Sequence, residues 1–468
     1  MHKFSTRIVV ALALCFTVLP LAFSKVGNGL SEPTSFNPHD PVAALTSPSI
    51  INGVWYLGWT ESAYGSSRMP SELMRLKTEL AANYVGLIIL FFQDFLTSID
   101  PHPDPGRTPS LATMARVIEE AHRLELGVIL LPYLVVDSKH QSEGATLEDW
   151  VGHLQPEDVE TWFDNYREIL HTYAAFAEET SVEIMLVGWE FEPMLPHHSE
   201  WQSTITELRD LYSGKLSYLT NWWADRDKYA EVLNWTPWRS LDFIGVSAYF
   251  ELTKDNDPTV GELKQAWYED AAGQNIVEDL EALFAQYEKP IVFWELGYQS
   301  KDGANGAPWN FVLCAPPDEG EQADALAAAF QVLENQPWFA GQVIWAEEAG
   351  LRKTPDSYGV LDKKAARIIK SYVFGLDNAV DAVLYEASGM TVGMFTNLSE
   401  AIVSGLHVEF DREVTILNKI EIGGYLPMLE EPTGTTFNFG EGEVEPGGMV
   451  ELDWEPAAAG PILVRWTD

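Results

Sequence analysis

Two glutamates, Glu190 and Glu295, are the residues of this sequence whose type and position best suit chemistry. Each stands at or near the end of a short apolar run, VGWE at 187–190 and VFWELGY at 292–298. A carboxylate in such a run is costly to bury without partners, so its presence needs a reason. The reason is either an ion pair inside the fold or proton transfer and nucleophilic attack. Because both glutamates stand among aromatic residues at equivalent places, the sequence favours chemistry.

Eight apolar runs recur along the chain, and longer segments of helical pattern separate them. Runs that are apolar throughout are typical of parallel strands covered on both faces. Eight strand–helix units close a (β/α)8 TIM barrel, which is therefore the predicted fold of residues 50–375. An open doubly wound sheet is the alternative, but no GxGxxG or Walker-type loop follows the early runs. The runs are 54–60, 84–92, 127–134, 183–190, 215–222, 243–250, 290–298 and 341–347.

A barrel would bring the two glutamates together. Active sites of such barrels form at the C-terminal ends of the strands, where the fourth run places Glu190 and the seventh places Glu295. Strands four and seven face each other across an eight-stranded barrel. Retaining glycosidases hold two carboxyl groups about 5–5.5 Å apart, one as nucleophile and one as acid and base. The pair therefore predicts cleavage of a glycosidic bond by double displacement.

Several segments resemble glycoside hydrolase family 113, the β-1,4-mannanases of the large retaining β-glycosidase clan. The resemblance extends over about residues 50 to 350. It implies that Glu190 is the acid/base, that Glu295 is the nucleophile, and that the substrate is a neutral polysaccharide or oligosaccharide, with β-1,4-mannan expected. No cofactor is implied. The segments that carry it are VGWE (187–190), YSGKLSYLTNWW (212–223), LDFIGVSAYFELT (241–253) and KPIVFWELGYQS (289–300).

The resemblance also implies roles for neighbouring residues. Tyr249 would hydrogen-bond the nucleophile, Trp345 would form the floor of the reactive sugar subsite, and Asn221 with Trp222 would line it. Trp189 departs from the clan pattern, in which Asn often precedes the acid/base and contacts the sugar 2-hydroxyl; Asn221 is a candidate for that contact. An aromatic residue in an apolar run is also commonly a core residue. Further substrate-binding candidates are Trp59, Phe92, Gln93, Tyr133, Trp189 and Trp294.

The two ends of the chain differ from the barrel segment in composition and in the pattern of apolar residues. Residues 1–24 carry Lys3 and Arg7 before an apolar stretch, which predicts a secretory signal peptide and a secreted or periplasmic protein. Residues 25–49, rich in Pro, Ser and Gly, predict a linker or surface arm. Residues 376–468 alternate apolar and polar positions, which predicts a small C-terminal β-sandwich that serves as an accessory domain.

The net charge of the chain limits the classes of partner that we expect it to bind. The formal net charge is −41, and a polyanion of this size repels nucleic acid and anionic lipid. We therefore expect a neutral carbohydrate substrate, no nucleic acid, and no membrane attachment after signal cleavage. The sequence makes no prediction of oligomeric state.

Two other function classes are weighed against the glycosidase. A metal-dependent hydrolase could use Glu190, Glu192, His197 and His198, but zinc barrels usually draw histidines from several strand ends, so no metal site is predicted. A carbohydrate-binding barrel without catalysis is the second alternative, and the presence of both glutamates argues against it. Glu192 also competes with Glu190 as acid, but it lies beyond the apolar run, where a solvated loop carboxylate is expected.

Overall fold

The computed structural model describes residues 50–136, 151–334, 336–350, 355–374, 380–387, 390–397, 405–425, 433–439, 443–455 and 461–467. The predicted signal peptide and the predicted arm lie outside the described residues. Within the described ranges, no helix is long and apolar enough to cross a membrane.

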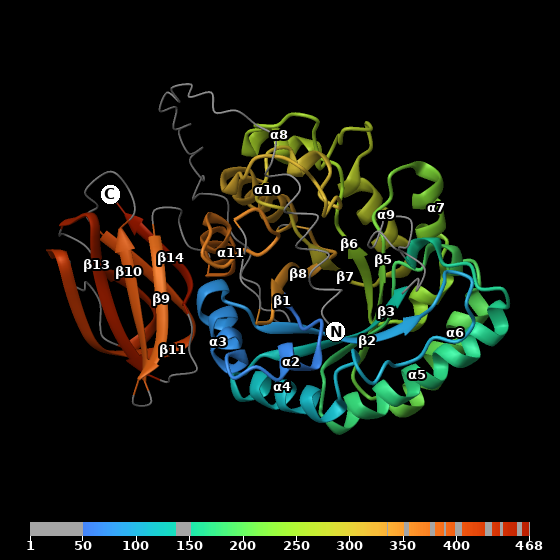
Figure 1. Ribbon diagram of the computed structural model, residues 1–468. Helices are drawn as coiled ribbons and strands as arrows, with labels where there is room; N and C mark the ends of the chain where they lie inside the picture. The colour runs from blue at the N-terminus through green and yellow to red at the C-terminus, as the bar shows by residue number, and fades with distance from the viewer. Residues whose placement is uncertain are drawn as a thin grey trace, which may run out of the picture.

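Eight parallel strands close into a barrel in sequence order, with β8 paired to β1 (Figure 1). Each predicted apolar run forms one strand, and the predicted (β/α)8 barrel is confirmed. The strands are buried along nearly their whole length because the barrel has a packed interior and an outer layer of helices. They are β1 (Ile51–Leu57), β2 (Tyr84–Gln93), β3 (Gly127–Val136), β4 (Ile184–Trp189), β5 (Lys215–Thr220), β6 (Phe243–Ser247), β7 (Ile291–Leu296) and β8 (Phe339–Glu348).

Helices follow the strands and cover the outside of the barrel (Figure 1). They are α2 (Glu61–Tyr64), α3 (Met69–Leu80), α4 (Leu111–Arg123), α5 (Val159–Glu179), α6 (His198–Leu211), α7 (Arg226–Leu233), α8 (Val260–Ala266), α9 (Ile276–Tyr287), α10 (Glu319–Leu333) and α11 (Lys364–Phe374). Short 3-10 turns are η3 (Val151–His153), η4 (Glu192–Met194), η5 (Thr236–Ser240) and η6 (Ala304–Gly306).

The helix starts are encoded locally. Ser110, Asp158 and Asn275 precede α4, α5 and α9, and the side chain of each accepts a backbone N–H of the first turn. Helix α5 then buries one face against the barrel and donates from the Tyr166 hydroxyl to the Val187 carbonyl at 2.9 Å. This bond ties the helix to the end of β4, where Glu190 follows.

A close approach inside the barrel depends on one glycine. A Cβ atom added at Gly245 in β6 would lie 2.1 Å from Cδ1 of Trp294 and 2.3 Å from the Tyr218 carbonyl oxygen. The indole of Trp294 in β7 therefore occupies the space that any larger residue at position 245 of β6 would need. Its N–H also donates to Ser217 in β5, so this one side chain contacts both β5 and β6.

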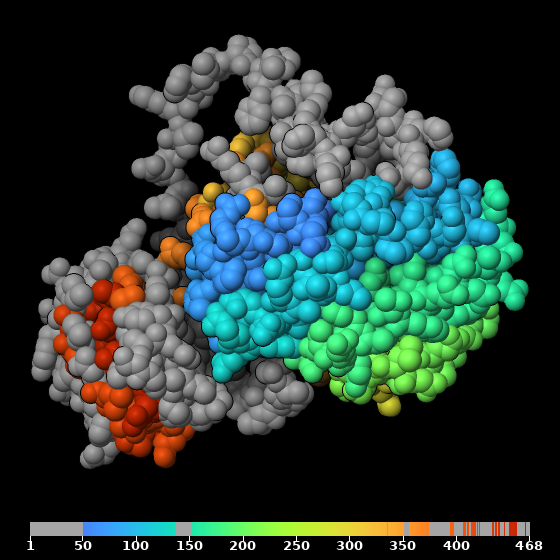
Figure 2. All heavy atoms as spheres, turned by 60° about the horizontal axis from the view of Figure 1, so that its bottom comes forward, coloured from blue at the N-terminus to red at the C-terminus, as the bar shows by residue number. Residues whose placement is uncertain are grey.

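The C-terminal part is an antiparallel sheet with the strand order β12-β11-β13-β10-β9, and β14 also pairs with β11. The long strand β11 pairs with β14 through its first half and with β13 through its second. The sheet has a hydrophobic core of its own, which agrees with the predicted β fold, and it contacts α3 and α11. Its described strands, coloured orange to red, lie to the left of the barrel in Figures 1 and 2. The strands are β9 (Val380–Ala387), β10 (Met390–Asn397), β11 (Gly405–Tyr425), β12 (Thr433–Phe439), β13 (Glu443–Glu455) and β14 (Pro461–Thr467).

Candidate active site

Glu190 occupies the turn directly after β4. Its side chain is buried, and its backbone has a φ of +50°, which is uncommon for a residue with a side chain. The Glu190 N–H donates to the Leu219 carbonyl at 2.7 Å, and the Phe191 N–H donates to the Tyr218 hydroxyl at 2.9 Å. Strand β5 therefore fixes the turn that carries Glu190.

Glu295 lies in β7 and is also buried. Two hydroxyl groups from β6 and the residues after it donate to its Oε2 atom: Tyr249 at 2.9 Å and Ser247 at 3.3 Å. The Ala248 N–H donates to the Glu295 carbonyl at 2.7 Å and fixes the backbone. Tyr249 thus makes the contact with Glu295 that the family resemblance implied.

The two carboxyl groups influence each other. Burial raises the pKa of Glu295 well above its usual value, and the Glu190 carboxylate raises it further, whereas the Tyr249 and Ser247 hydroxyls lower it. Burial also raises the pKa of Tyr133, with contributions from Glu295 and then Glu190. Charges interact strongly only when they are close or share a region of low dielectric constant. Glu190, Glu295 and Tyr133 therefore belong to one buried electrostatic cluster at the strand ends.

An aromatic cluster covers the β1–β4 side of this region. The rings of Tyr133 in β3 and Trp189 in β4 are stacked, with centroids 4.0 Å apart and planes 19° apart. Trp59, just after β1, meets Tyr133 edge-on at 5.8 Å. The position that the clan often gives to Asn is thus one half of an aromatic stack in this chain.

Asn221 and Trp222 follow β5 on the other side. The Asn221 amide donates to Glu192 Oε1 at 2.8 Å, and its Oδ1 accepts from the Trp222 N–H at 3.0 Å. Glu192 also forms an ion pair with Lys228 at 2.9 Å, and its side chain is only 17% exposed. The expectation that Glu192 is a solvated loop carboxylate is therefore wrong: Glu192 is a partner that fixes Asn221.

The remaining candidates differ in what their polar groups contact. Trp294 is fully buried, and its indole N–H donates to Ser217 Oγ at 2.8 Å. Trp345 in β8 is half-buried and meets Trp55 edge-on at 6.4 Å. The ring of Trp345 therefore keeps an exposed surface, whereas the polar group of Trp294 is used within the fold.

Phe92 and Gln93 at the end of β2 make contacts within the protein. The guanidinium carbon of Arg107 lies 3.8 Å from the centroid of the Phe92 ring. The Gln93 amide donates to the Phe95 carbonyl at 2.7 Å, and its oxygen accepts from the Trp162 indole at 3.0 Å. These contacts join β2 to α5 and to the loop after β2.

Three residues that contact the candidate site residues were not among the predicted candidates. Ser247 donates to Glu295, as described above, and it stands two positions before Tyr249 in the same run. Tyr358 meets Tyr249 edge-on at 6.3 Å and donates to the Pro308 carbonyl at 2.5 Å. Trp309 lies nearly parallel to Trp222, with centroids 6.2 Å apart. Only Ser247 had a signal in the sequence, because Tyr358 and Trp309 lie in loops.

The histidines and Glu192 of the alternative metal site each contact a different group. His198 contacts Thr236 Oγ1 at 2.9 Å, the His197 ring packs edge-on against Phe163, and Glu192 pairs with Lys228. In the part of the chain that the structure describes, no group of three or more His, Cys, Asp or Glu side chains is placed to hold a metal ion.

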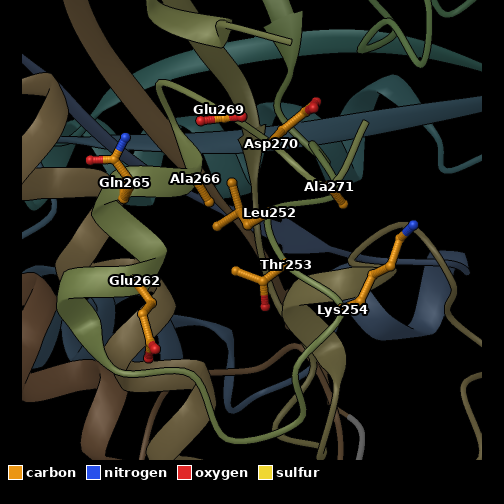
Figure 3. Close-up of a pocket in the computed structure, with 9 residues that line it drawn as sticks. All are labelled: Leu252, Thr253, Lys254, Glu262, Gln265, Ala266, Glu269, Asp270 and Ala271. Atoms are coloured by element: carbon orange, nitrogen blue, oxygen red, sulfur yellow. The ribbon is translucent and has the colours of Figure 1, made fainter. Parts of the chain in front are cut away.

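A surface cavity of about 340 Å³ lies beside the segment that follows β6 (Figure 3). Figure 3 shows Leu252 and Ala266 in its centre with polar side chains around them. Two of its carboxylates serve local turns, because Glu262 accepts from the Thr259 N–H and Asp270 accepts from the Ala272 N–H. None of the candidate site residues lines this cavity. The lining residues are Leu252, Thr253, Lys254, Glu262, Gln265, Ala266, Glu269, Asp270 and Ala271.

A closed (β/α)8 barrel with two buried, electrostatically coupled glutamates at its strand ends is an arrangement typical of glycoside hydrolases. The family model described as Glycoside Hydrolase Family 113 matches residues 55–360, and the chain belongs to this family. It is therefore a glycoside hydrolase.

Solved structures agree in fold. A GH113 β-1,4-mannanase solved as a complex has a TM-score of 0.59 and 24% identity, over 69% of this chain and 99% of that chain. The GH113 β-mannanase AaManA from Alicyclobacillus acidocaldarius, in complex with ManMIm, has a TM-score of 0.57 and 23% identity, over 69% and 97%. No curated protein matches the chain.

Proposed function

We propose that this protein hydrolyses β-1,4-mannan or its oligosaccharides by double displacement, with Glu295 as nucleophile and Glu190 as acid/base. The observation that carries the proposal is the buried, mutually coupled pair of carboxyl groups at the ends of β4 and β7. Membership of family 113 and the likeness in fold to two β-mannanases support the choice of sugar.

The reaction has two steps. In the first, a carboxylate oxygen of Glu295 bonds to the anomeric carbon while Glu190 gives a proton to the leaving oxygen. In the second, Glu190 takes a proton from water, and the water oxygen replaces Glu295 at the same carbon. Two inversions give a product with the configuration of the substrate.

The hydrogen bonds support this division of roles. A nucleophile must be ionised, and an acid must hold a proton. The Tyr249 and Ser247 hydroxyls donate to Glu295 and favour its ionised form. These two donors therefore suit Glu295 for the role of nucleophile.

Substitution of each glutamate tests the assignment. We expect Glu295→Gln and Glu190→Gln to lower kcat/KM on mannooligosaccharides by at least about a thousandfold, since each removes a group that acts in the transition state. Glu192→Gln is the matched control, because it changes a neighbouring carboxylate that contacts Asn221 and Lys228. A loss in Glu192→Gln as large as in Glu190→Gln would contradict the choice of acid.

Product stereochemistry tests the mechanism. Proton NMR of the first product formed by the wild type should show the β-anomer, and an initial α-anomer would exclude double displacement. With added azide, the small variant Glu295→Ala should form the α-glycosyl azide, because azide then enters from the face that Glu295 has left. Equal and negligible turnover by the wild type, Glu190→Gln and Glu295→Gln on several β-glycosides would favour a barrel that binds carbohydrate without catalysis.

We also propose that the protein is exported, on the basis of Lys3, Arg7 and the apolar stretch that follows them. N-terminal sequencing of the protein recovered from medium or periplasm should begin near residue 25. An intact N-terminus on protein retained in the cell would contradict export.

A further inference from the structure

A row of aromatic rings leads away from Glu295. Tyr249 donates to Glu295, Trp222 meets Tyr249 edge-on at 5.8 Å, and Trp309 lies nearly parallel to Trp222, with 17° between the planes. Trp222 and Trp309 are both half-buried, so each keeps part of its ring surface open. The row therefore begins at the reacting centre and ends at the surface.

Trp309 is held in place by bonds that leave its ring surface available. Its indole N–H donates to Glu251 Oε1 at 3.0 Å, and Tyr358 donates to the carbonyl of the preceding residue, Pro308. Further along the same loop, Gln299 donates to the Phe311 carbonyl at 3.1 Å and Lys301 donates to the Leu313 carbonyl at 2.5 Å. A loop fixed at four points presents a preorganised surface, and preorganisation lowers the entropy cost of binding.

Apolar surface continues beyond Trp309. Phe311 and Val312 are each 51% exposed, the largest exposures among the large hydrophobic residues of the described chain. Trp309, Phe311 and Val312 therefore place three partly exposed apolar side chains on one short segment, and exposed apolar surface is a candidate for ligand contact. The C–H faces of a sugar ring pack on aromatic rings of this kind, while the hydroxyl groups at the ring edge stay in water.

The order of the strands shows on which arc of the barrel the aromatic row lies. Glu190 follows β4 and Glu295 lies in β7, so β5 and β6 separate them on one arc of the barrel and β8, β1, β2 and β3 separate them on the other. A sugar chain that passes between the two carboxyl groups must cross from one arc to the other. Trp222 follows β5, and its neighbour Asn221 bonds to Glu192 in the turn that carries Glu190. Trp222 is thus the neighbour of a residue that is hydrogen-bonded to Glu192, two positions after Glu190, the residue proposed to protonate the leaving oxygen.

We propose that Trp222 and Trp309 form a leaving-group subsite, which binds the sugar unit that departs when Glu190 protonates the glycosidic oxygen. This assignment places Trp222 on the other side of the cleaved bond from the reactive sugar subsite that the family resemblance implied for it. This inference rests on the function proposed above and deepens it. A substrate of at least two sugar units is then required for full activity.

The test compares substrates that do and do not fill this subsite. A β-mannosyl or β-mannobiosyl fluoride has a leaving group with no ring, whereas mannotetraose places sugar units on both sides of the cleaved bond. We expect Trp309→Ala to lower kcat/KM on mannotetraose by about tenfold or more, the effect of losing one well-buried apolar contact. Both fluorides should react within about twofold of the wild type.

Two matched variants separate the ring from its neighbours. Trp309→Phe keeps an aromatic face but loses the bond to Glu251, and it should stay within about threefold of the wild type on mannotetraose. Tyr268→Ala removes another exposed ring, 43% accessible, that lies outside the row, and it should change neither substrate class.

Three results would overturn the inference. An unchanged rate of Trp309→Ala on mannotetraose would mean that no sugar binds there. An equal loss on mannotetraose and on both fluorides would mean that the ring supports the reacting centre itself. A loss on mannobiosyl fluoride but not on mannosyl fluoride would place the bound sugar on the opposite side of the cleaved bond. If the wild type hydrolyses neither fluoride nor mannotetraose, the proposed function fails, and that outcome is distinct from these three.

Discussion

Replacing Tyr249 by Phe removes the shorter of the two hydroxyl contacts to Glu295. The hydroxyl donates to Oε2 at 2.9 Å and lowers the pKa of a carboxyl group whose pKa is raised by burial and by Glu190. Phe keeps the ring and its edge contact with Trp222. The substitution therefore changes the charge balance of Glu295 with little change in packing.

The size of the effect follows from the hydrogen bond. A hydrogen bond to a charged group contributes about 1.5–3 kcal/mol, and a tenfold change in an equilibrium constant corresponds to about 1.4 kcal/mol. The Tyr249 hydroxyl stabilises the ionised form of Glu295, so its loss raises the pKa of that carboxyl. The acid limb of the profile of kcat/KM against pH should then move to higher pH by about 1–2 units.

The assay is kcat/KM on a chromogenic β-mannoside across the acid and neutral range. Tyr212→Phe serves as control, because the Tyr212 hydroxyl also makes one buried bond, to the Val182 carbonyl at 2.8 Å, far from Glu295 in the barrel. The control should lose stability but keep the wild-type profile. A folded Tyr249→Phe enzyme whose acid limb coincides with that of the wild type would refute the reasoning.

Other substitutions address stability and the second hydroxyl. Glu295→Gln should unfold at a higher temperature than the wild type at neutral pH, and calorimetry should show the gain shrink as the pH falls toward the ordinary carboxyl pKa. The sign follows because a raised folded pKa makes the charged form destabilising above the unfolded pKa. Gly245→Ala should lower the unfolding free energy by about 2–3 kcal/mol, because its Cβ would collide with Trp294; denaturant titration that shows no loss would contradict the packing described. Ser247→Ala should move the acid limb in the same direction as Tyr249→Phe but less, because its contact is longer at 3.3 Å; a larger shift in the same pH assay would contradict this ranking.

The barrel was predictable because its strands are buried on both faces. Runs such as YVGLIILFF at 84–92 carry no alternation, and the structure buries them from end to end. Burial on both faces requires a parallel sheet covered by helices, and eight such runs fix the number of strands. The positions of Glu190 and Glu295 at strand ends followed from the same pattern.

A polar side chain at the end of a barrel strand can be catalytic or can support the fold, and its position alone does not distinguish the two roles. Glu347 also stands near the end of a strand and is buried, yet its Oε1 accepts from the Val360 and Leu361 N–H groups. Its role follows from the loop after β8, which no periodicity in the sequence describes. Gln93 is similar, since only the packing of α5 on the barrel brings the Trp162 indole to its amide oxygen. Contacts made by loops and helices far apart in sequence, including that of Trp309, were therefore beyond the reach of the sequence pattern.

The partners of Glu295 are hydroxyl dipoles, and this choice suits a nucleophile. The groups that lower the pKa of Glu295 are Tyr249 and Ser247, and within the described chain no cation is among the influences on its pKa. A lysine or arginine at that distance would hold the negative charge on Glu295 strongly, and the charge must disappear when the carboxylate oxygen bonds to the anomeric carbon. Hydroxyl donors favour the ionised form by less, so less stabilisation is lost when the covalent intermediate forms. Lys228, the cation that pairs with Glu192 in the turn after β4, also pairs with Glu231, so two carboxylates share its charge.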